Sequence, residues 1–114
     1  MSHEPEFVKQ IDLDTFNGPM DILQKLPFTF KFHQLPAAAG NGVLSAVRYD
    51  RDNEDDAGVD VSSLVTFALN VITVAHFFLP AETAAPGNYR VKVQGASQDD
   101  AKRDVVNITF SMKA

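Results

Sequence analysis

The fold is decided by the sequence from Pro86 to Met112, PGNYRVKVQGASQDDAKRDVVNITFSM. Apolar and polar residues alternate from Tyr89 to Gln94 and again from Val105 to Met112. An alternation of period two is typical of a strand that buries one face and exposes the other, as strands of antiparallel sheets do. The stretch therefore predicts two strands joined by a polar loop from Gly95 to Asp104. Such a hairpin is marginal alone, so the preceding chain must supply an opposing layer.

Further strands are predicted before this stretch. Leu26 to Phe32 alternates clearly, and Val43 to Tyr49 follows a loop that is rich in alanine, glycine and proline. The apolar run from Val61 to Leu79 is too long for one strand, so we divide it near Asn70. A helix over Ser63 to Phe78 is the alternative, because buried strands and buried helices share this pattern. The enrichment in Val, Ile, Thr and Phe favours two strands.

Six to seven short strands separated by turns indicate an all-β fold, a single antiparallel β-sandwich of the immunoglobulin-like kind. The spacing in Gly87-Asn88-Tyr89-Arg90-Val91 is that of a tyrosine corner, in which a tyrosine hydroxyl bonds to upstream backbone. The alternative is an ordinary strand tyrosine. The expected core residues are Phe28, Phe30, Phe32, Tyr89, Val91, Val93, Ile108 and Phe110.

The N-terminal segment is treated separately from the sandwich domain, which we expect over residues 14–114. Residues 1–13 are predicted to form either an assembly arm or an edge strand, because the first six are polar and a blurred alternation follows. In the first case the segment adds a strand to the sheet edge of a neighbouring subunit. The candidate partner-binding residues are then Phe7, Val8, Ile11 and Leu13.

Composition narrows the possible partners. The 114 residues include no cysteine, so a disulfide or a thiolate metal site is excluded. The formal net charge of −5 repels nucleic acid at long range. Polar residues interrupt the longest apolar run before it could cross a bilayer. We therefore expect neither a nucleic-acid partner nor a membrane partner.

No catalytic or cofactor-binding constellation is predicted. His3, His33 and His76 fall in three separate elements, and no pair has the spacing of metal ligands. No glycine-rich loop is followed by Lys and Ser or Thr, and no serine lies in a nucleophile-elbow pattern. The expectation is a protein that is not an enzyme and that acts on no small-molecule substrate.

One acidic segment, from Asp50 to Asp60, is the arguable ligand site. Its acids at alternate positions resemble the start of a calcium-binding loop. However, Asp55 stands where that loop needs glycine, and Val61 stands where it needs a bidentate glutamate. We expect a solvated loop without a metal.

Several short motifs together resemble a known family. They are the Asp21-Ile22-Leu23 lead-in, the strand Phe28-Thr29-Phe30, Leu79, and the closing Gly87-x-Tyr89-x-Val91 hairpin. This pattern is similar to small immunoglobulin-like virion proteins of tailed bacteriophages, of the fibre or tail adaptor and head decoration types. The chain departs from them by its acidic insertion and by having no tryptophan.

The resemblance implies a non-enzymatic structural protein that decorates the capsid or attaches fibre or tail components. It implies contacts with other virion proteins and with copies of itself, and a location in the virion after synthesis in the host cytoplasm. The alternative is a carbohydrate- or cell-surface-binding module on a similar sandwich. Aromatic residues exposed in loops would favour that alternative, but the predicted loops contain mainly alanine, glycine, proline and acids.

Overall fold

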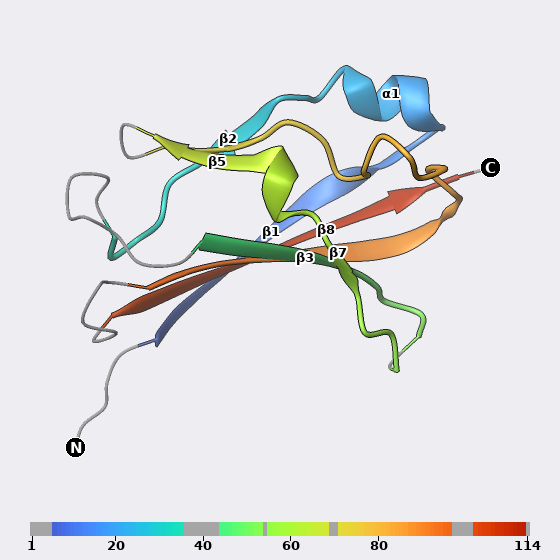
Figure 1. Cartoon of the computed structure of the whole chain (residues 1–114). Coiled ribbons are helices and arrows are strands. Elements are labelled where there is room, and N and C mark those ends of the chain that lie inside the picture. Colours follow the sequence, from blue (N-terminus) through green and yellow to red (C-terminus); the bar gives the residue numbers. More distant parts are fainter. Residues whose placement is uncertain (1–5, 36–43, 54, 69–70, 97–101, 114) are drawn as a thin grey trace.

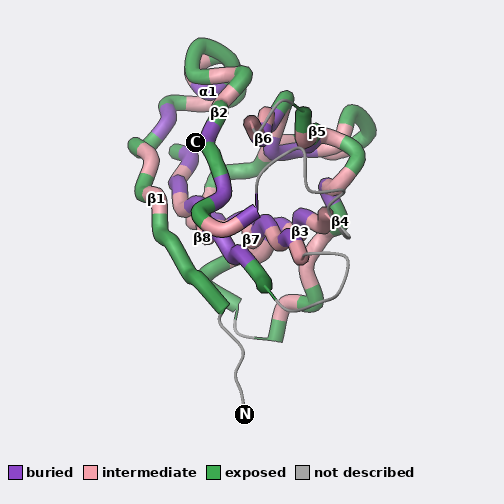
Figure 2. The backbone as a smooth tube through the Cα atoms, turned by 90° about the vertical axis from the view of Figure 1, so that its left-hand side faces the viewer, coloured by how far each residue is buried: buried purple, intermediate pink, exposed green. Residues whose placement is uncertain are grey.

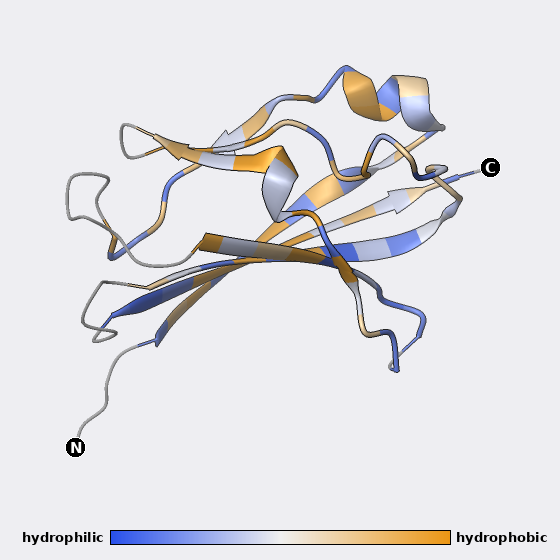
Figure 3. Cartoon of the chain, viewed as in Figure 1, coloured by the Kyte–Doolittle hydropathy of each residue, from blue (hydrophilic) through white to orange (hydrophobic). Residues whose placement is uncertain are grey.

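The protein has two β-sheets that face each other across one hydrophobic core (Figure 1). The structure, a computed structural model, describes residues 6–35, 44–53, 55–68, 71–96 and 102–113. Hydrophobic and hydrophilic residues alternate along the longer strands, as the bands on β1 and β7 in Figure 3 show. This alternation turns one face of each strand toward the core.

The larger sheet has five strands. Their order is β1 (Glu6–Phe16), β8 (Arg103–Met112), β7 (Gly87–Ala96), β3 (Leu44–Asp50) and β4 (Val59–Asp60). β7 pairs with β8 and with β3 in antiparallel fashion, whereas β1 pairs with β8 in parallel. A register shift between Asp12 and Thr15 marks a bulge in β1.

The smaller sheet has three antiparallel strands and covers the inner face of the larger one. Its order is β2 (Phe28–Phe30), β6 (Val71–Val74) and β5 (Val65–Ala68). The short helix α1 (Pro19–Leu23) joins β1 to β2, and the one-turn 3₁₀ helix η2 (Ser62–Leu64) precedes β5. Both helices thus lie where the chain crosses from the larger sheet to the smaller one.

The core is dominated by aromatic side chains from both sheets and from the segment after β6. The ring of Phe110 lies 4.6 Å from Phe77, 5.3 Å from Tyr89 and 6.2 Å from Phe16, centroid to centroid. Seven of the eight predicted core residues are buried, and the eighth, Phe28, is partly buried against the same cluster. The predicted inward face is therefore correct.

The structure corrects the predicted strands in three respects. The sheets are not purely antiparallel, because β1 runs parallel to β8; a parallel pair needs a long connection, and nearly the whole domain separates these two strands. The described residues form eight strands instead of six to seven, because the acidic segment contributes the two-residue β4. The strand predicted over Leu26 to Phe32 is shorter, at Phe28–Phe30.

Other predicted boundaries differ less. The division of the apolar run near Asn70 agrees with β5 and β6, and no helix longer than the single turn of η2 occurs in the described part of Ser63 to Phe78. The polar loop after β7 is shorter than expected, because β7 extends to Ala96 and β8 begins at Arg103.

Candidate functional site

The predicted partner-binding residues lie on β1, at one edge of the larger sheet. Phe7 and Val8 have exposed fractions of 38% and 55%, whereas Ile11 and Leu13 are partly buried against the core. Phe7 stacks on the imidazole of His33, with ring centroids 3.9 Å apart. The structure therefore brings Phe7 and Val8 to the surface and uses Ile11 and Leu13 in packing.

The edge formed by β1 is open. β1 pairs with β8 on one side, and no strand in the described residues pairs with its other side. The first five residues of β1 are all exposed (Figure 2). An unpaired edge presents backbone N–H and C=O groups that can pair with a further strand. Acidic and basic residues interrupt its apolar ones, as is usual for edges that do not aggregate.

The acidic segment after β3 is folded by its own carboxylates. Asp56 accepts hydrogen bonds from the backbone N–H groups of Asp50 and Gly58, at 2.7 and 2.9 Å. These bonds hold the pKa of Asp56 below its ordinary value. Asp50 accepts the N–H of Asp52, whose carboxylate accepts two bonds from the Asn88 side chain. The carboxylates that suggested a calcium loop thus serve as turn and cap acceptors, and Glu54 lies outside the described residues.

A buried ion pair fixes the segment between β6 and β7 to the larger sheet. Arg48 on β3 donates to both carboxylate oxygens of Glu82 and to the carbonyl oxygen of Phe77, and its guanidinium lies 4.4 Å from the Phe78 ring centroid. The Arg48 side chain is 8% exposed and that of Glu82 is 24% exposed. The bonds from Arg48 lower the pKa of Glu82. The sequence pattern missed this pair because its members are 34 residues apart.

The tyrosine corner predicted from the spacing is present. The Tyr89 hydroxyl donates to the carbonyl oxygen of Ala85 at 2.6 Å. Burial raises the pKa of this phenol. The bond therefore ties the start of β7 to the loop that precedes it.

A buried acid anchors the chain after β2. Asp104, 1% exposed, accepts the backbone N–H groups of Gln34 and Leu35 at 2.8 and 3.0 Å. From the alternation of apolar and polar residues, Asp104 was predicted to end a polar loop. Its hydrogen-bond partners are 69 and 70 residues away, and the sequence around Asp104 does not indicate them. Glu82, which is partly buried, and Asp104, which is buried, therefore both join distant segments.

The surface formed by the described residues includes two hollows. One, of about 590 Å³, is open and polar, and lies on the outer face of the larger sheet beside Tyr49, Arg51 and Arg90. The other, of about 490 Å³, is mainly apolar and lies between Pro19 of α1 and the segment after β6. Two carboxylates, Asp50 and Asp56, line the first hollow, and both accept backbone N–H groups. Among the described side chains, neither hollow contains a nucleophile hydrogen-bonded to a base.

The described histidines make structural contacts. His33 stacks on Phe7, and Nδ1 of His76 accepts the N–H groups of Phe77 and Phe78 at 3.0 Å. His3 lies outside the described residues. Across the described ranges, no three histidine or acidic side chains gather closely enough to hold a metal ion, and no helix is long and apolar enough to span a bilayer.

Comparison with models of known protein families found no match, and comparison with curated protein sequences found none.

Proposed function

We propose that this chain is a non-enzymatic immunoglobulin-like module of a tailed-bacteriophage virion, which attaches to other virion proteins through the open edge of β1. The observation that carries the proposal is the edge itself. It is eleven residues long, contains no proline, and exposes Phe7 and Val8 beside unpaired backbone. Addition of a strand from a partner would satisfy that backbone and cover both side chains.

Strand order supports the immunoglobulin-like assignment. In immunoglobulin domains, strands C, F and G form one sheet and strands B, E and D form the other. Here β3, β7 and β8 are adjacent in one sheet, and β2, β6 and β5 are adjacent in the other, each in the corresponding chain order. The bond from Tyr89 to Ala85 agrees with the same assignment. The attachment of β1 to β8 leaves the outer side of β1 without a neighbour among the described strands.

The virion assignment rests on the motif resemblance. Its motifs occupy α1, β2 and the start of β7, so they lie in the parts of the chain that define the fold. The alternative, a sugar-binding module, needs an aromatic ring with a free face. One face of the Tyr49 ring, beside the polar hollow, is covered, because the Arg90 guanidinium lies 4.9 Å from its centroid. The structural role is therefore the better supported of the two.

The test uses two substitutions of exposed apolar residues on different surfaces. Val8→Lys places a charge on the β1 edge, and Met20→Lys, at a residue 75% exposed on α1, is the matched control. Particles assembled in cells that carry the encoding genome would be purified and their protein content measured by mass spectrometry. We expect the parent and Met20→Lys chains in the particles and much less of the Val8→Lys chain. Absence of the parent from particles, or equal incorporation of all three chains, would overturn the proposal.

A further inference from the structure

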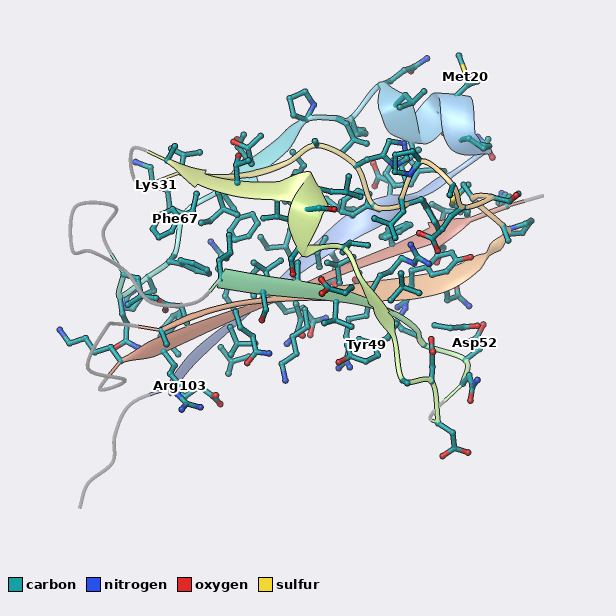
Figure 4. All side chains as sticks on the ribbon, viewed as in Figure 1. Met20, Lys31, Tyr49, Asp52, Phe67 and Arg103 are labelled. Atoms are coloured by element: carbon teal, nitrogen blue, oxygen red, sulfur yellow. The ribbon has the colours of Figure 1, made fainter. Side chains whose placement is uncertain are left out.

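The polar hollow on the outer face of the larger sheet contains hydrogen-bond donors that no described residue uses. Its lining includes Gln10, Tyr49, Asp50, Arg51, Arg90 and Thr109. Outward-facing residues of neighbouring strands meet here, because Tyr49 on β3 is paired with Arg90 on β7, which is paired with Thr109 on β8. Figure 4 shows Tyr49 pointing away from the smaller sheet.

Arg90 is half-buried and held in place by an aromatic ring. Its guanidinium lies 4.9 Å from the Tyr49 ring centroid. The side chain forms neither an ion pair nor a hydrogen bond with any residue in the described ranges. The Tyr49 ring in turn packs closely against Gly58, where a Cβ would lie 2.8 Å from its Cε1 atom. The hollow thus holds a guanidinium in a defined position with its N–H groups unused.

Carboxylates beside the hollow already accept hydrogen bonds. Oδ1 of Asp12 accepts the Thr109 hydroxyl and the Gln10 amide, at 2.6 and 2.8 Å. Both carboxylate oxygens of Asp56 accept backbone N–H groups. By contrast, the Arg90 guanidinium and the Tyr49 hydroxyl, which line the hollow, form no hydrogen bond with a described residue. A ligand that supplies acceptors matches these two donors.

We propose that the hollow binds a carboxylate, with Arg90 as a two-point clamp and the Tyr49 hydroxyl as a third donor. A guanidinium stacked on a ring keeps its edge free, and that edge matches the two oxygens of a carboxylate. Within the lining, the formal charges of Arg51 and Arg90 are balanced by those of Asp50 and Asp56, so attraction depends on these short-range bonds. The occupant is an acidic side chain of a peptide segment, because a short peptide brings a carboxylate to the hollow with far fewer negative charges than a nucleic acid, which the net charge of −5 repels.

This site lies on the outer face of the sheet, and its lining extends to Gln10 on β1. Its two donors, however, come from β3 and β7, so Arg90→Lys tests this proposal and Val8→Lys tests virion attachment, and either can fail alone. The experiment titrates the ¹⁵N-labelled full chain with a capped tetraglutamate peptide, with the matching tetraglutamine peptide, and with acetate. We expect saturable shifts at the amides of Tyr49, Arg90 and Thr109 with tetraglutamate and none with tetraglutamine. A matching response to acetate would show that the carboxylate alone suffices.

Arg90→Lys keeps the charge and removes the planar fork, so affinity for tetraglutamate should fall about tenfold or more. Tyr49→Phe should cause a smaller loss. Lys31→Gln, which removes an exposed cation elsewhere, should change nothing. Unsaturable shifts spread over all exposed cations would overturn the proposal, as would unchanged affinity in an Arg90→Lys chain whose spectrum shows the native fold.

Discussion

β7 and β1 flank the same strand, β8, yet their surroundings differ. β7 has partners on both sides, and its alternate residues Tyr89, Val91 and Val93 are buried. β1 has one partner, and eight of its eleven residues are exposed. Ile11 and Leu13 are partly buried against the core, and Phe16 is buried. The centre of the sheet therefore supplies stability, and the edge keeps exposed surface, which the proposed partner strand would cover. The predictions below test this division.

The largest effect is expected at the centre. Phe110→Ala removes a ring that packs against four other aromatic rings, with centroids 4.6 to 6.2 Å away, and should lower the free energy of unfolding by about 3–5 kcal/mol. Phe7→Ala, the same change at the edge, should cost about 1 kcal/mol, since it loses one exposed stacking contact. Urea denaturation measures both. Equal losses would contradict the division between centre and edge.

A smaller loss is expected when the buried ion pair is broken. Glu82→Gln leaves the Arg48 guanidinium without its counter-ion and should cost about 2 kcal/mol, below the range for fully buried pairs because Glu82 is 24% exposed. The double variant Arg48→Met/Glu82→Leu should recover most of this stability. Thermal unfolding compares the three chains. A double variant less stable than Glu82→Gln would contradict this explanation.

The same pair makes stability depend on pH. The folded pKa of Glu82 lies below its ordinary value of 4.5. Its contribution is therefore fully present above that value and is lost as the pH falls through the lower, folded pKa. Asp12, Asp56 and Asp60 have lowered pKa values as well and add to acid sensitivity. Unfolding measured between neutral and acidic pH should show Glu82→Gln losing less stability than the parent; identical pH profiles would contradict the assignment.

The tyrosine corner should have a more modest effect. Tyr89→Phe removes the bond to the Ala85 carbonyl oxygen and should cost about 1–2 kcal/mol. Tyr49→Phe removes a hydroxyl that bonds to no residue in the described part of the chain, so this variant should have the same free energy of unfolding as the parent. A comparable loss in both variants would remove the specific role of Tyr89.

The smallest effect is expected at the edge. Val8→Lys should change the free energy of unfolding by less than about 0.5 kcal/mol, because the Val8 side chain is 55% exposed. Differential scanning calorimetry would measure it. A loss of several degrees in melting temperature would show that Val8 stabilises the fold, and any effect on assembly would then have a different cause.

The regular strands could be predicted because their signal is local. β7 and β8 each repeat apolar and polar residues with period two, and the tyrosine corner depends on a spacing of four residues. The core face followed from the same alternation. These features need no knowledge of partners elsewhere in the chain.

The features that joined distant segments could not be predicted. Charged side chains are seldom buried, so the sequence gives no reason to place Arg48 and Asp104 in the interior. Only the fold brings Glu82 beside Arg48 and the backbone of Gln34 beside Asp104. The parallel pairing of β1 also depends on which sheet edge is available. Of the candidate sites, the edge was predicted from its residues, and Phe7 and Val8 are exposed there. The polar hollow was not predicted, because its residues come together only when three strands pair.

The most direct test is amide hydrogen exchange of the free protein and of the same protein bound in assembled particles. If the open edge of β1 is the attachment surface, amides from Glu6 to Asp12 should exchange much more slowly in particles, while those of β7, already paired on both sides, should change little. Unchanged exchange in β1, together with new protection at α1 or on the outer face of the sheet, would contradict the account.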